Sequence, residues 1–437
     1  MKLVEAQIDR VVGPTHHYGG LGVGNVASMQ NEGSISNPRA AALQGLEKMR
    51  LVAQLGVPQF ILPPQPRPDL RFLRQIGYEG PREEVLPRLA DENPRLLSVA
   101  MSCSAMWTAN AATVSAAVDG EHEQAYMTVA NLSSSLHRAI EPSQTLADLW
   151  QTFPQHVRML DPLPGGAMMR DEGAANHMRL GSDECKPGIH IFVYGDQDPL
   201  PKSFWPRQTR AACEAIARRH RLPVENTFFI KQHPDAIDAG AFHNDVVAAS
   251  HRHVLLHHEL AFYEAESTLD QVQLRYAQLY DQELIRIAVP SSELSIQDTV
   301  ATYLFNSQIV GPSDGPSPVI LCPAQVNEHS DAKRIVDRWC NQDKLFRSAH
   351  FLDLRQSMAG GGGPACLRLR VPLTEDVIDV VPEYRRFSDE NYQNLKAAIE
   401  QFYPESLSFA DLSNPAFVEQ TSHAAEEITQ RLSYRSE

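Results

Sequence analysis

The sequence predicts a mixed α/β protein, and two observations support this. Short runs typical of strands recur along the chain of 437 residues, and runs with helical spacing of apolar side chains lie between several of them. Because the strands are short and do not all alternate with helices, a simple doubly wound sheet fits poorly. No glycine- or proline-rich linker divides the chain, although its length alone favours two or three domains.

Ten runs rich in apolar and β-branched residues are expected to form strands. They cover residues 3–9, 96–101, 125–132, 189–195, 226–232, 253–258, 284–290, 318–324, 349–355 and 366–373. Helices are expected at residues 39–56, 207–220, 258–286 and 388–403. Asn37 and Ser388 supply N-caps, and Gly56 supplies a stop. The segment from about residue 406 reads as a polar helical tail, and no internal repeat is visible.

Charge and cysteine usage restrict the class of protein. Lys and Arg number 39 against 54 Asp and Glu, a net charge of −15, which argues against a nucleic-acid partner. The N-terminal residues do not resemble a signal peptide, and no apolar run is long enough to span a bilayer. Six scattered cysteines without a CxxC pair are typical of reduced thiols in the cytoplasm.

The stretch "SMAGGGGPACLRLRV", residues 357–371, places a cysteine directly after four glycines and a proline. Glycine allows backbone to approach a ligand closely, and proline then fixes the chain direction. Apolar residues alternate with Arg368 and Arg370, as in a half-buried strand. Cys366 therefore lies at the mouth of a strand, a position that suits either a nucleophile or an ordinary buried cysteine.

Two further segments carry residues that complement a thiol. "RDEGAANH" holds Glu172, and "FHNDVVA" holds His243 and Asp245. A histidine can act as base to Cys366, and a carboxylate can orient that histidine. Two residues past His243 in an extended chain, Asp245 would face the same side, and paired carboxylates suit a planar guanidinium. A turn and a solvated acidic loop are the structural alternatives for these segments.

Histidines and glycines raise two other possibilities. His251 and His253 would share a strand face that could hold zinc, but the chain has no HExxH and no zinc-finger spacing, which favours a solvated histidine cluster. The glycine-rich "YGGLGVGN", residues 18–25, lacks the lysine of a P-loop, yet its N–H groups could hold an anion.

Eight motifs together resemble one enzyme family. They are "THHYGGLGVGNVAS", "MWTANAATVS", "TVANL" with "LHR", "DEGAANH", "PRQTR", "FHNDVVA", "TYLFNSQ" and "GGGPACLRLR". In this order, from about Gly13 to Arg370, they identify the chain as a member of the N-succinylarginine dihydrolase family.

The resemblance implies a fold and a reaction. The family is similar to the guanidine-modifying penteins, whose fold is a five-bladed α/β propeller with pseudo-fivefold symmetry. Residues 1–437 would then be a single catalytic domain, with the polar helical tail from about residue 406, rather than several domains. The reaction would convert N2-succinylarginine to N2-succinylornithine, two ammonia and carbon dioxide. No metal or organic cofactor is implied, and the protein would be a cytoplasmic homodimer.

The matching positions imply residue roles. Cys366 would be the nucleophile, His243 the acid/base and Glu172 its charged partner, while Asp245 would hold the guanidinium. Arg138 and Arg207 would pair with substrate carboxylates. The remaining substrate-binding positions are Gly19, Gly20, Leu21, Gly22, Val23, Gly24, Asn25, Val26, Ala27, Ser28, Asn110, His137 and Gly360. At Gly360 the family is expected to carry asparagine, so one substrate hydrogen bond is expected to be missing.

Three rival functions remain compatible with the residues. One is a related pentein chemistry, a one-step arginine-type deiminase or an amidinotransferase. Another is a protein that binds succinylarginine with an unreactive Cys366. The third is a zinc protein built on the histidines.

Overall fold

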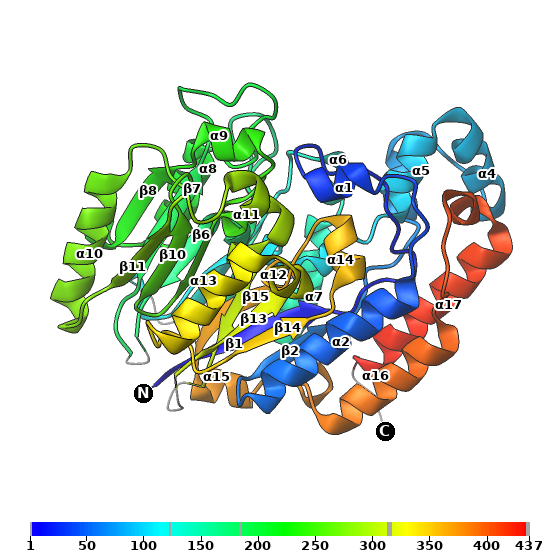
Figure 1. Ribbon diagram of the computed structural model, residues 1–437. Coiled ribbons are helices and arrows are strands. Elements are labelled where there is room, and N and C mark those ends of the chain that lie inside the picture. The colour runs from blue at the N-terminus through cyan, green and yellow to red at the C-terminus, as the bar shows by residue number, and fades with distance from the viewer. Residues whose placement is uncertain (1, 122–123, 183–184, 313–316, 434–437) are drawn as a thin grey trace.

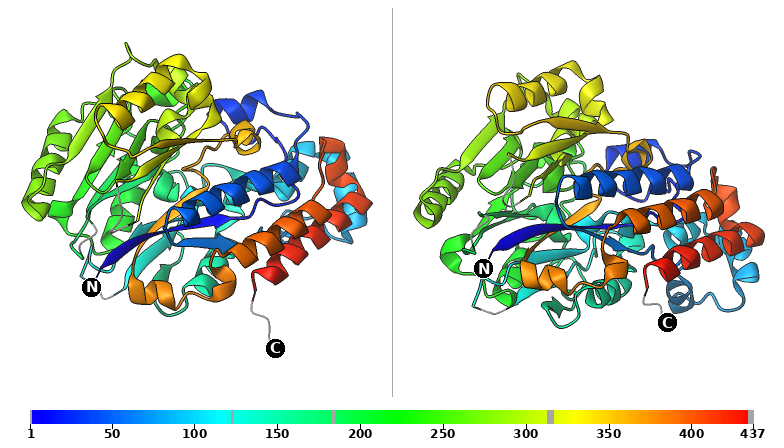
Figure 2. Two further views of the ribbon diagram at one scale, coloured as in Figure 1. Left: turned by 60° about the horizontal axis from the view of Figure 1, so that its bottom comes forward. Right: turned by 90° about the horizontal axis from the view of Figure 1, so that it is seen from below.

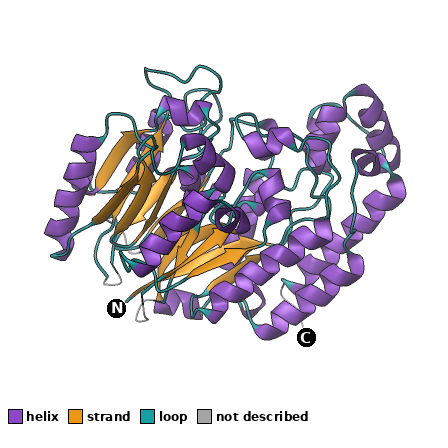
Figure 3. Ribbon diagram, viewed as in Figure 1, coloured by secondary structure: helices purple, strands orange, loops and turns teal. Residues whose placement is uncertain are grey.

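The computed structural model describes residues 2–121, 124–182, 185–312 and 317–433. Within these ranges the strands form five three-stranded sheets. Figure 1 and Figure 3 show the sheets in the middle of the molecule with helices packed around their outer side. No helix in the described ranges is long and apolar enough to cross a membrane.

All five sheets share one plan. The middle strand pairs antiparallel with the first strand and parallel with the third. In this order the sheets are β15 (Arg368–Thr374), β1 (Leu3–Arg10), β2 (Gln59–Leu62); β3 (Ala112–Ser115), β4 (Ala125–Val129), β5 (Val157–Leu160); β6 (His177–Leu180), β7 (Ile189–Tyr194), β8 (Thr227–Lys231); β9 (Ala248–His251), β10 (Val254–His258), β11 (Ile285–Val289); and β12 (Gln308–Val310), β13 (Val319–Pro323), β14 (Ala349–Leu352).

Helices make the crossover between the middle and third strand of each sheet. These crossover helices are α1 (Val26–Gln30), α2 (Pro38–Gln54), α6 (Leu136–Ala139), α7 (Pro142–Thr152), α8 (Arg210–Arg219), α10 (Glu266–Tyr280), α12 (Ala324–Glu328) and α13 (Ser330–Asn341). The others connect successive sheets or follow the last strand: α3 (Leu70–Gln75), α4 (Arg82–Glu92), α5 (Pro94–Met101), α9 (Pro234–Asp238), α11 (Ile296–Thr302), α14 (Arg355–Gly360), α15 (Glu375–Asp379), α16 (Asp389–Phe402) and α17 (Pro415–Arg431).

A tight turn precedes the first strand of every sheet. In four repeats it is a 3₁₀ turn: η2 (Thr108–Asn110), η3 (Gly173–Asn176), η5 (Asn244–Val246) and η6 (Leu304–Asn306). In the fifth, residues 364–367 turn just before β15. The first strands contact one another in the pairs β15–β3, β6–β9 and β9–β12, so these strands and their turns surround a common axis. The chain therefore does contain five repeats of backbone geometry, which sequence inspection missed.

The two ends of the repeat region close on each other. β1 pairs antiparallel with β15 in a register that runs from Leu3 opposite Thr374 to Asp9 opposite Arg368. The chain start thereby completes the sheet that begins just after Cys366. Leu369 and Val371 are fully buried while Arg368 and Arg370 are only partly so, which confirms the predicted alternation.

Nine of the ten predicted strands are present, but residues 96–101 form most of helix α5 instead. Asn93 accepts a hydrogen bond from the Leu96 N–H, and Pro94 occupies the first turn, so a capped helix starts there. The apolar run then buries one side of this helix, as Leu97 and Met101 are fully buried. A short apolar run does not distinguish a buried helix from a buried strand.

Two further expectations are wrong in detail. Residues 258–265 precede helix α10 and residues 281–286 follow it, rather than belonging to it. His251 ends β9 and His253 precedes β10, so they flank a tight turn instead of sharing a strand face. The caps at Asn37, Ser388 and Gly56 are confirmed: the two side chains accept from Ala40 N and Asn391 N, and Gly56 has φ of +79°.

The C-terminal segment is helical as expected, and it is packed against the rest of the chain. α17 buries Val418 and Ile428, and Val418 joins a core cluster with residues of α4 and α5. Figure 2 shows α16 and α17 alongside each other at the edge of the molecule. The helix is thus amphipathic, with its polar residues on the outer face.

Candidate active site

The turns that precede the first strands bring five separated segments to one place. A cavity of about 50 Å³, termed here the front pocket, is lined by residues in or beside three of these turns, by the glycine-rich loop, and by residues of α6, α14 and the segment before α8. Its lining residues are His17, Tyr18, Gly19, Leu21, Gly22, Asn25, Ser28, Ser102, Trp107, Asn110, His137, Arg138, Arg207, Phe242, His243, Gly360, Gly361 and Cys366. Cys366 and His243 share this pocket although 123 positions separate them, 366 minus 243.

Asn306 and Asp245 hold the thiol of Cys366. Asn306 donates from Nδ2 to Sγ at 3.2 Å, and its Oδ1 accepts the Cys366 N–H at 3.2 Å. The Sγ also lies 3.5 Å from Asp245 Oδ2. Cys366 is only 4% exposed, and burial together with the Asp245 charge raises the pKa of its thiol well above the ordinary value. In the ligand-free protein the thiol is therefore protonated at neutral pH.

His243 and Glu172 form a buried pair. His243 Nε2 lies 2.6 Å from Glu172 Oε2, and Arg138 Nη1 donates to that same oxygen at 2.6 Å. Ser134 Oγ donates to the other oxygen, Oε1, at 2.6 Å. Both carboxylate oxygens of Glu172 thus have partners, and the charge of the carboxylate is balanced by Arg138.

The pKa shifts indicate the protonation states of Glu172 and His243. Burial by itself would raise the pKa of Glu172, but Arg138 and His243 lower it below the usual range, so the carboxylate is ionised. Burial lowers the pKa of His243 to about 4 despite the Glu172 charge, so the imidazole is neutral at pH 7. Because Nε2 donates its proton to Glu172, Nδ1 is left as the proton acceptor, and it has no partner within the described protein.

Asp245 contacts the thiol from a turn and not from the extended segment that the sequence predicted. The chain is not extended after His243: residues 244–246 form the 3₁₀ turn η5, with His243 as its N-terminal flanking residue. Asp245 therefore does not share a strand face with His243, and its carboxylate contacts Cys366 Sγ without lining the front pocket. Burial raises the pKa of the Asp245 carboxyl to about 6, which the hydrogen bond with Cys366 partly offsets.

Besides His243, three buried cationic or basic side chains line the pocket. Arg207 donates to the Val23 carbonyl at 2.7 Å and stacks on Phe242, with Cζ 4.7 Å from the ring centroid. Arg138 uses one amino group on Glu172, and its Nη2 has no partner among the described residues. Burial lowers the pKa of His137 well below its ordinary value, so it is neutral. The front pocket thus keeps guanidinium N–H groups for an anionic ligand.

Half of the glycine-rich loop, Gly19 to Ser28, lines the front pocket. Gly19, Leu21, Gly22, Asn25 and Ser28 line the pocket, whereas Gly20, Val23, Gly24, Val26 and Ala27 do not. Asn25 fixes the loop, because its Nδ2 donates to Gly361 O at 2.8 Å while its Oδ1 caps α1. Gly361 has φ of +100°, and a Cβ there would collide with the Asn25 side chain, so glycine is needed at that position.

Gly360 lies in the pocket wall beside an indole ring. A Cβ on Gly360 would lie 3.0 Å from Trp107 Cζ2 and 3.4 Å from His16 Cε1. Trp107 Nε1 donates to Ser357 Oγ at 3.1 Å, which holds the ring in this place. An asparagine at position 360 would thus require a shift of a few tenths of an ångström in its neighbours.

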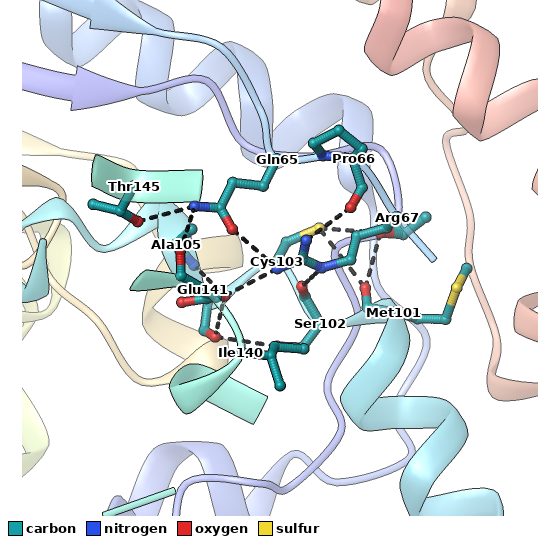
Figure 4. A network of polar contacts seen from close by, with 12 residues as sticks. Gln65, Pro66, Arg67, Met101, Ser102, Cys103, Ala105, Ile140, Glu141 and Thr145 are labelled. Atoms are coloured by element: carbon teal, nitrogen blue, oxygen red, sulfur yellow. Dashed lines mark hydrogen bonds and ion pairs between the residues drawn. The ribbon is translucent and has the colours of Figure 1, made fainter. Parts of the chain in front are cut away.

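A buried polar network supports the base of the pocket (Figure 4). Arg67 donates from Nε to the Ser102 carbonyl at 2.5 Å and from Nη2 to Glu141 Oε1 at 3.2 Å. That same Glu141 oxygen accepts from Ser104 Oγ at 2.8 Å and from the Ala105 N–H at 2.9 Å. These bonds fix the segment that leads from Ser102 to Trp107 and Asn110.

The histidines do not gather into a metal site. His251 Nδ1 lies 3.4 Å from Glu5, and His258 Nε2 lies 3.0 Å from the Leu294 carbonyl. In the ranges that the structure describes, no three His, Cys, Asp or Glu side chains are placed to share a metal ion.

Several side chains of the site were not predicted from the sequence. Asn306 is the most important, and its only signal in the sequence is its place in the motif "TYLFNSQ". Trp107, Phe242, Tyr18, His17 and Ser102 also line the pocket. Glu172 and Asp245 were expected at the site and lie just outside the pocket lining, each bonded to a residue that lines it.

Comparison with known proteins shows the family of this chain. The family model described as succinylarginine dihydrolase matches residues 2–436. The N-succinylarginine dihydrolase of Serratia proteamaculans (strain 568) is 43% identical over 431 residues, which is 97% of this chain and 96% of the relative. The enzyme of the same name from Shewanella sediminis (strain HAW-EB3) is 42% identical over 98% of this chain and 97% of its own length.

A solved structure shares the fold. The N-terminal domain of ArgZ, an arginine dihydrolase from cyanobacteria crystallised with its product, superposes with a TM-score of 0.52 at 14% identity and covers 84% of this chain and 97% of that domain. This likeness and the five repeated sheets assign the chain to the pentein α/β fold. With its family model matched over nearly the whole length, the chain belongs to the succinylarginine dihydrolase family of guanidine-hydrolysing enzymes.

Proposed function

We propose that this protein hydrolyses the guanidine group of N2-succinyl-L-arginine, giving N2-succinyl-L-ornithine, two ammonia and carbon dioxide. The observation that carries the proposal is that a buried thiol contacts a carboxylate and shares a pocket with a neutral histidine. Cys366 Sγ lies 3.5 Å from Asp245, and His243 in the same pocket leaves Nδ1 unpartnered. A planar cation between these groups meets a nucleophile, a counter-charge and a base.

The substrate's charges match the ends of the pocket. Its guanidinium is the cationic end and pairs with Asp245. Its carboxylates are the anionic end and pair with Arg207 and with the unpartnered Nη2 of Arg138. Glu172 is already bonded by Arg138 and His243, so its role is to orient the histidine rather than to grip the guanidinium.

Substrate binding also activates the nucleophile. The Asp245 carboxylate raises the pKa of the Cys366 thiol, because two negative charges would lie close together. A guanidinium placed against Asp245 neutralises that charge and favours the thiolate. His243 Nδ1 can take the proton, since the imidazole is neutral at pH 7.

The first round then exchanges one C–N bond for one C–O bond. Thiolate adds to the guanidinium carbon, His243 returns the proton to the leaving nitrogen, and ammonia departs. His243 next takes a proton from water, the hydroxide adds to the S-linked carbon, and the C–S bond breaks to give N2-succinylcitrulline and free thiol.

A second round on the ureido group completes the reaction. The thiolate attacks the ureido carbon, and a second water releases N2-succinylornithine, ammonia and carbon dioxide. Two waters are consumed and two ammonia released per substrate. Retention of N2-succinylcitrulline at the site distinguishes this dihydrolase from a deiminase, which stops after the first round.

Product analysis tests the proposal. Purified protein is given N2-succinylarginine, or free arginine as control, and ammonia is counted per N2-succinylornithine formed. Two ammonia per product, inert arginine and no turnover by Cys366→Ser support the proposal. Cys213→Ser, at a buried cysteine of α8 outside the pocket, is the matched control and keeps activity.

Other outcomes assign the rival functions. One ammonia with N2-succinylcitrulline as final product indicates a deiminase, and transfer to an added amine indicates an amidinotransferase. Binding without turnover, together with alkylation of Cys366 no faster than of the other cysteines, indicates a non-catalytic binding protein.

We also propose, on the family resemblance, that residues 1–437 act as one catalytic domain in a cytoplasmic homodimer. Six cysteines, all without disulfide partners, suit a reducing compartment. Light scattering of the purified protein gives the mass of the assembly, and a monomer at micromolar concentration would contradict the dimer.

A further inference from the structure

A second cavity lies behind Asp245 and runs along the axis of the five repeats. This axial chamber measures about 70 Å³. The first strand of every sheet contributes to its wall, through Val114 of β3, Met178 of β6, Ala249 of β9, Ile309 of β12 and Arg368 of β15. The chamber is therefore built by the fivefold arrangement itself.

Asp245 stands between the axial chamber and the front pocket. Its Oδ2 lies 3.5 Å from Cys366 Sγ, which lines the front pocket, while Asp245 itself lines the chamber. Asn244 and Ala365 line the same end of the chamber, and Ala365 adjoins the nucleophile in sequence. The chamber thus ends directly behind the reacting thiol.

The chamber wall carries buried polar atoms that no protein group satisfies. Within the described part of the chain these include Asn244 Oδ1, Asp245 Oδ1, Ser250 Oγ and Arg368 Nε. Buried polar atoms in proteins are almost always bonded to protein or to ordered water. A polar cavity needs only about 10–15 Å³ to hold one water, so this chamber is suited to several small polar molecules.

At the end remote from Asp245, the chamber adjoins a smaller cavity. Glu5, Arg179 and Pro372 line both the chamber and a smaller cavity of about 20 Å³, which extends to Gly181 and Ser182. The side chain of Glu5 is 20% exposed, so solvent reaches this end. Glu5 lies 3.5 Å from Arg370 and 3.4 Å from His251, so charged side chains line this end of the chamber.

We propose that the axial chamber supplies the hydrolytic water and receives the released ammonia while the substrate still fills the front pocket. The inference rests on the proposed function, since each of two rounds on one bound molecule takes in one water and gives out one ammonia. Cys366 is 4% exposed through a pocket of about 50 Å³. A bound succinylarginine would separate the thiol from bulk water on that side, whereas the chamber adjoins Asp245 on the other side.

Filling the chamber tests the proposal. Ser250→Leu and Ala249→Leu add bulk to its wall without touching the front pocket. The matched control is Ala215→Leu, the same added volume at a partly buried position of α8 on the outer layer. Each variant is assayed for kcat, KM, the inhibition constant of N2-succinylornithine, and the fraction of N2-succinylcitrulline released from N2-succinylarginine.

The chamber variants are expected to lose kcat by about tenfold or more. Their KM and their inhibition constant for N2-succinylornithine are expected to change less than about twofold. N2-succinylcitrulline is expected to appear in the medium, because the first product leaves before the second water arrives. Ala215→Leu is expected to match wild type in every readout. If a leucine variant is unfolded by circular dichroism, valine at the same position carries the test.

The experiment distinguishes failure of the proposed function from failure of the proposed role of the chamber. Wild-type protein that does not turn over N2-succinylarginine overturns the proposed function. Active wild-type protein with folded chamber variants that keep wild-type kcat and release no N2-succinylcitrulline overturns the role of the chamber and leaves the proposed function standing.

Discussion

Asn306 holds Cys366 by both its backbone and its thiol. The side-chain amide of Asn306 accepts the Cys366 N–H through Oδ1 and donates to Sγ through Nδ2, each at 3.2 Å. Both residues are buried, and they come from turns that precede two different sheets. One amide therefore fixes the position of the proposed nucleophile and stabilises the thiolate form of Cys366.

Asn306→Ala is expected to lower kcat/KM by about 10- to 100-fold, since a hydrogen bond to a charged group contributes about 1.5–3 kcal/mol. The Asn306 bond lowers the pKa of Cys366, so its loss raises that pKa further. Iodoacetamide labelling followed by peptide mass spectrometry across pH measures this. Asn226→Ala, which removes a buried bond to Arg275 far from the pocket, serves as control. An unchanged labelling profile in Asn306→Ala would contradict the assignment.

The acid limb of kcat/KM is expected near pH 6. Asp245 must be ionised to hold the guanidinium, and burial raises its pKa to about 6. The pKa of His243, lowered to about 4, leaves the base neutral throughout this range. Burial also raises the pKa of Asp171 to about 6, so Asp171→Asn is the informative control. If that variant lost the limb at pH 6, Asp171 and not Asp245 would be the titrating group.

Asp245→Asn is expected to stabilise the fold at pH 7 while abolishing turnover. The folded-state pKa of Asp245 is raised from 3.8 to about 6, so between these values the folded state keeps a proton that the unfolded state releases. Stability of the wild type therefore falls as pH rises through this window, and above it the penalty is constant at about 1–3 kcal/mol. Urea unfolding at pH 7 and pH 3.5 measures the difference, which should vanish at the lower pH. Equal stability of the two proteins at pH 7 would refute the buried-charge argument.

Glu172→Gln is expected to cost about 3–5 kcal/mol of unfolding free energy, because it leaves the buried Arg138 charge without its partner. It also removes the group that orients His243, so kcat/KM should fall as well. Asp148→Asn breaks a comparable buried pair, with Arg10 at 2.5 Å, outside the site. Thermal unfolding and steady-state kinetics are compared for both. Asp148→Asn should lose stability and keep kcat/KM; equal loss of activity in the two variants would reduce Glu172 to a structural role.

Gly360→Asn is expected to lower KM or leave it unchanged, with kcat within about twofold, as one neutral hydrogen bond contributes about 0.5–1.5 kcal/mol. Gly360 does not need a positive φ, so the backbone accepts asparagine once Trp107 shifts slightly. Gly361→Asn is the contrasting variant, because φ of +100° and the Asn25 side chain exclude a Cβ there. It should lose stability and substrate affinity. A switch of substrate in Gly360→Asn would show that position 360 sets specificity instead.

The sequence by itself determined the local features of this protein. The alternation of residues 367–371 fixed which side chains of β15 are buried, and Asn37 and Ser388 fixed where two helices begin. These features depend on a few neighbouring residues, so local patterning is sufficient for them. The motifs also identified the family and the residues expected at its site.

Only the tertiary structure decided how those residues meet. The five repeats share a backbone plan and differ in sequence at the turns, which read "TAN", "GAAN", "NDV", "LFN" and "PAC", so no pattern of residue types revealed them. The contacts of Asn306 and Asp245 with Cys366 follow from the arrangement of the first strands and their turns around one axis. The helix at residues 96–101 begins at the Asn93 cap and Pro94, and its apolar side is buried in a cluster with α4 and the C-terminal helix; the apolar run alone does not distinguish it from a strand.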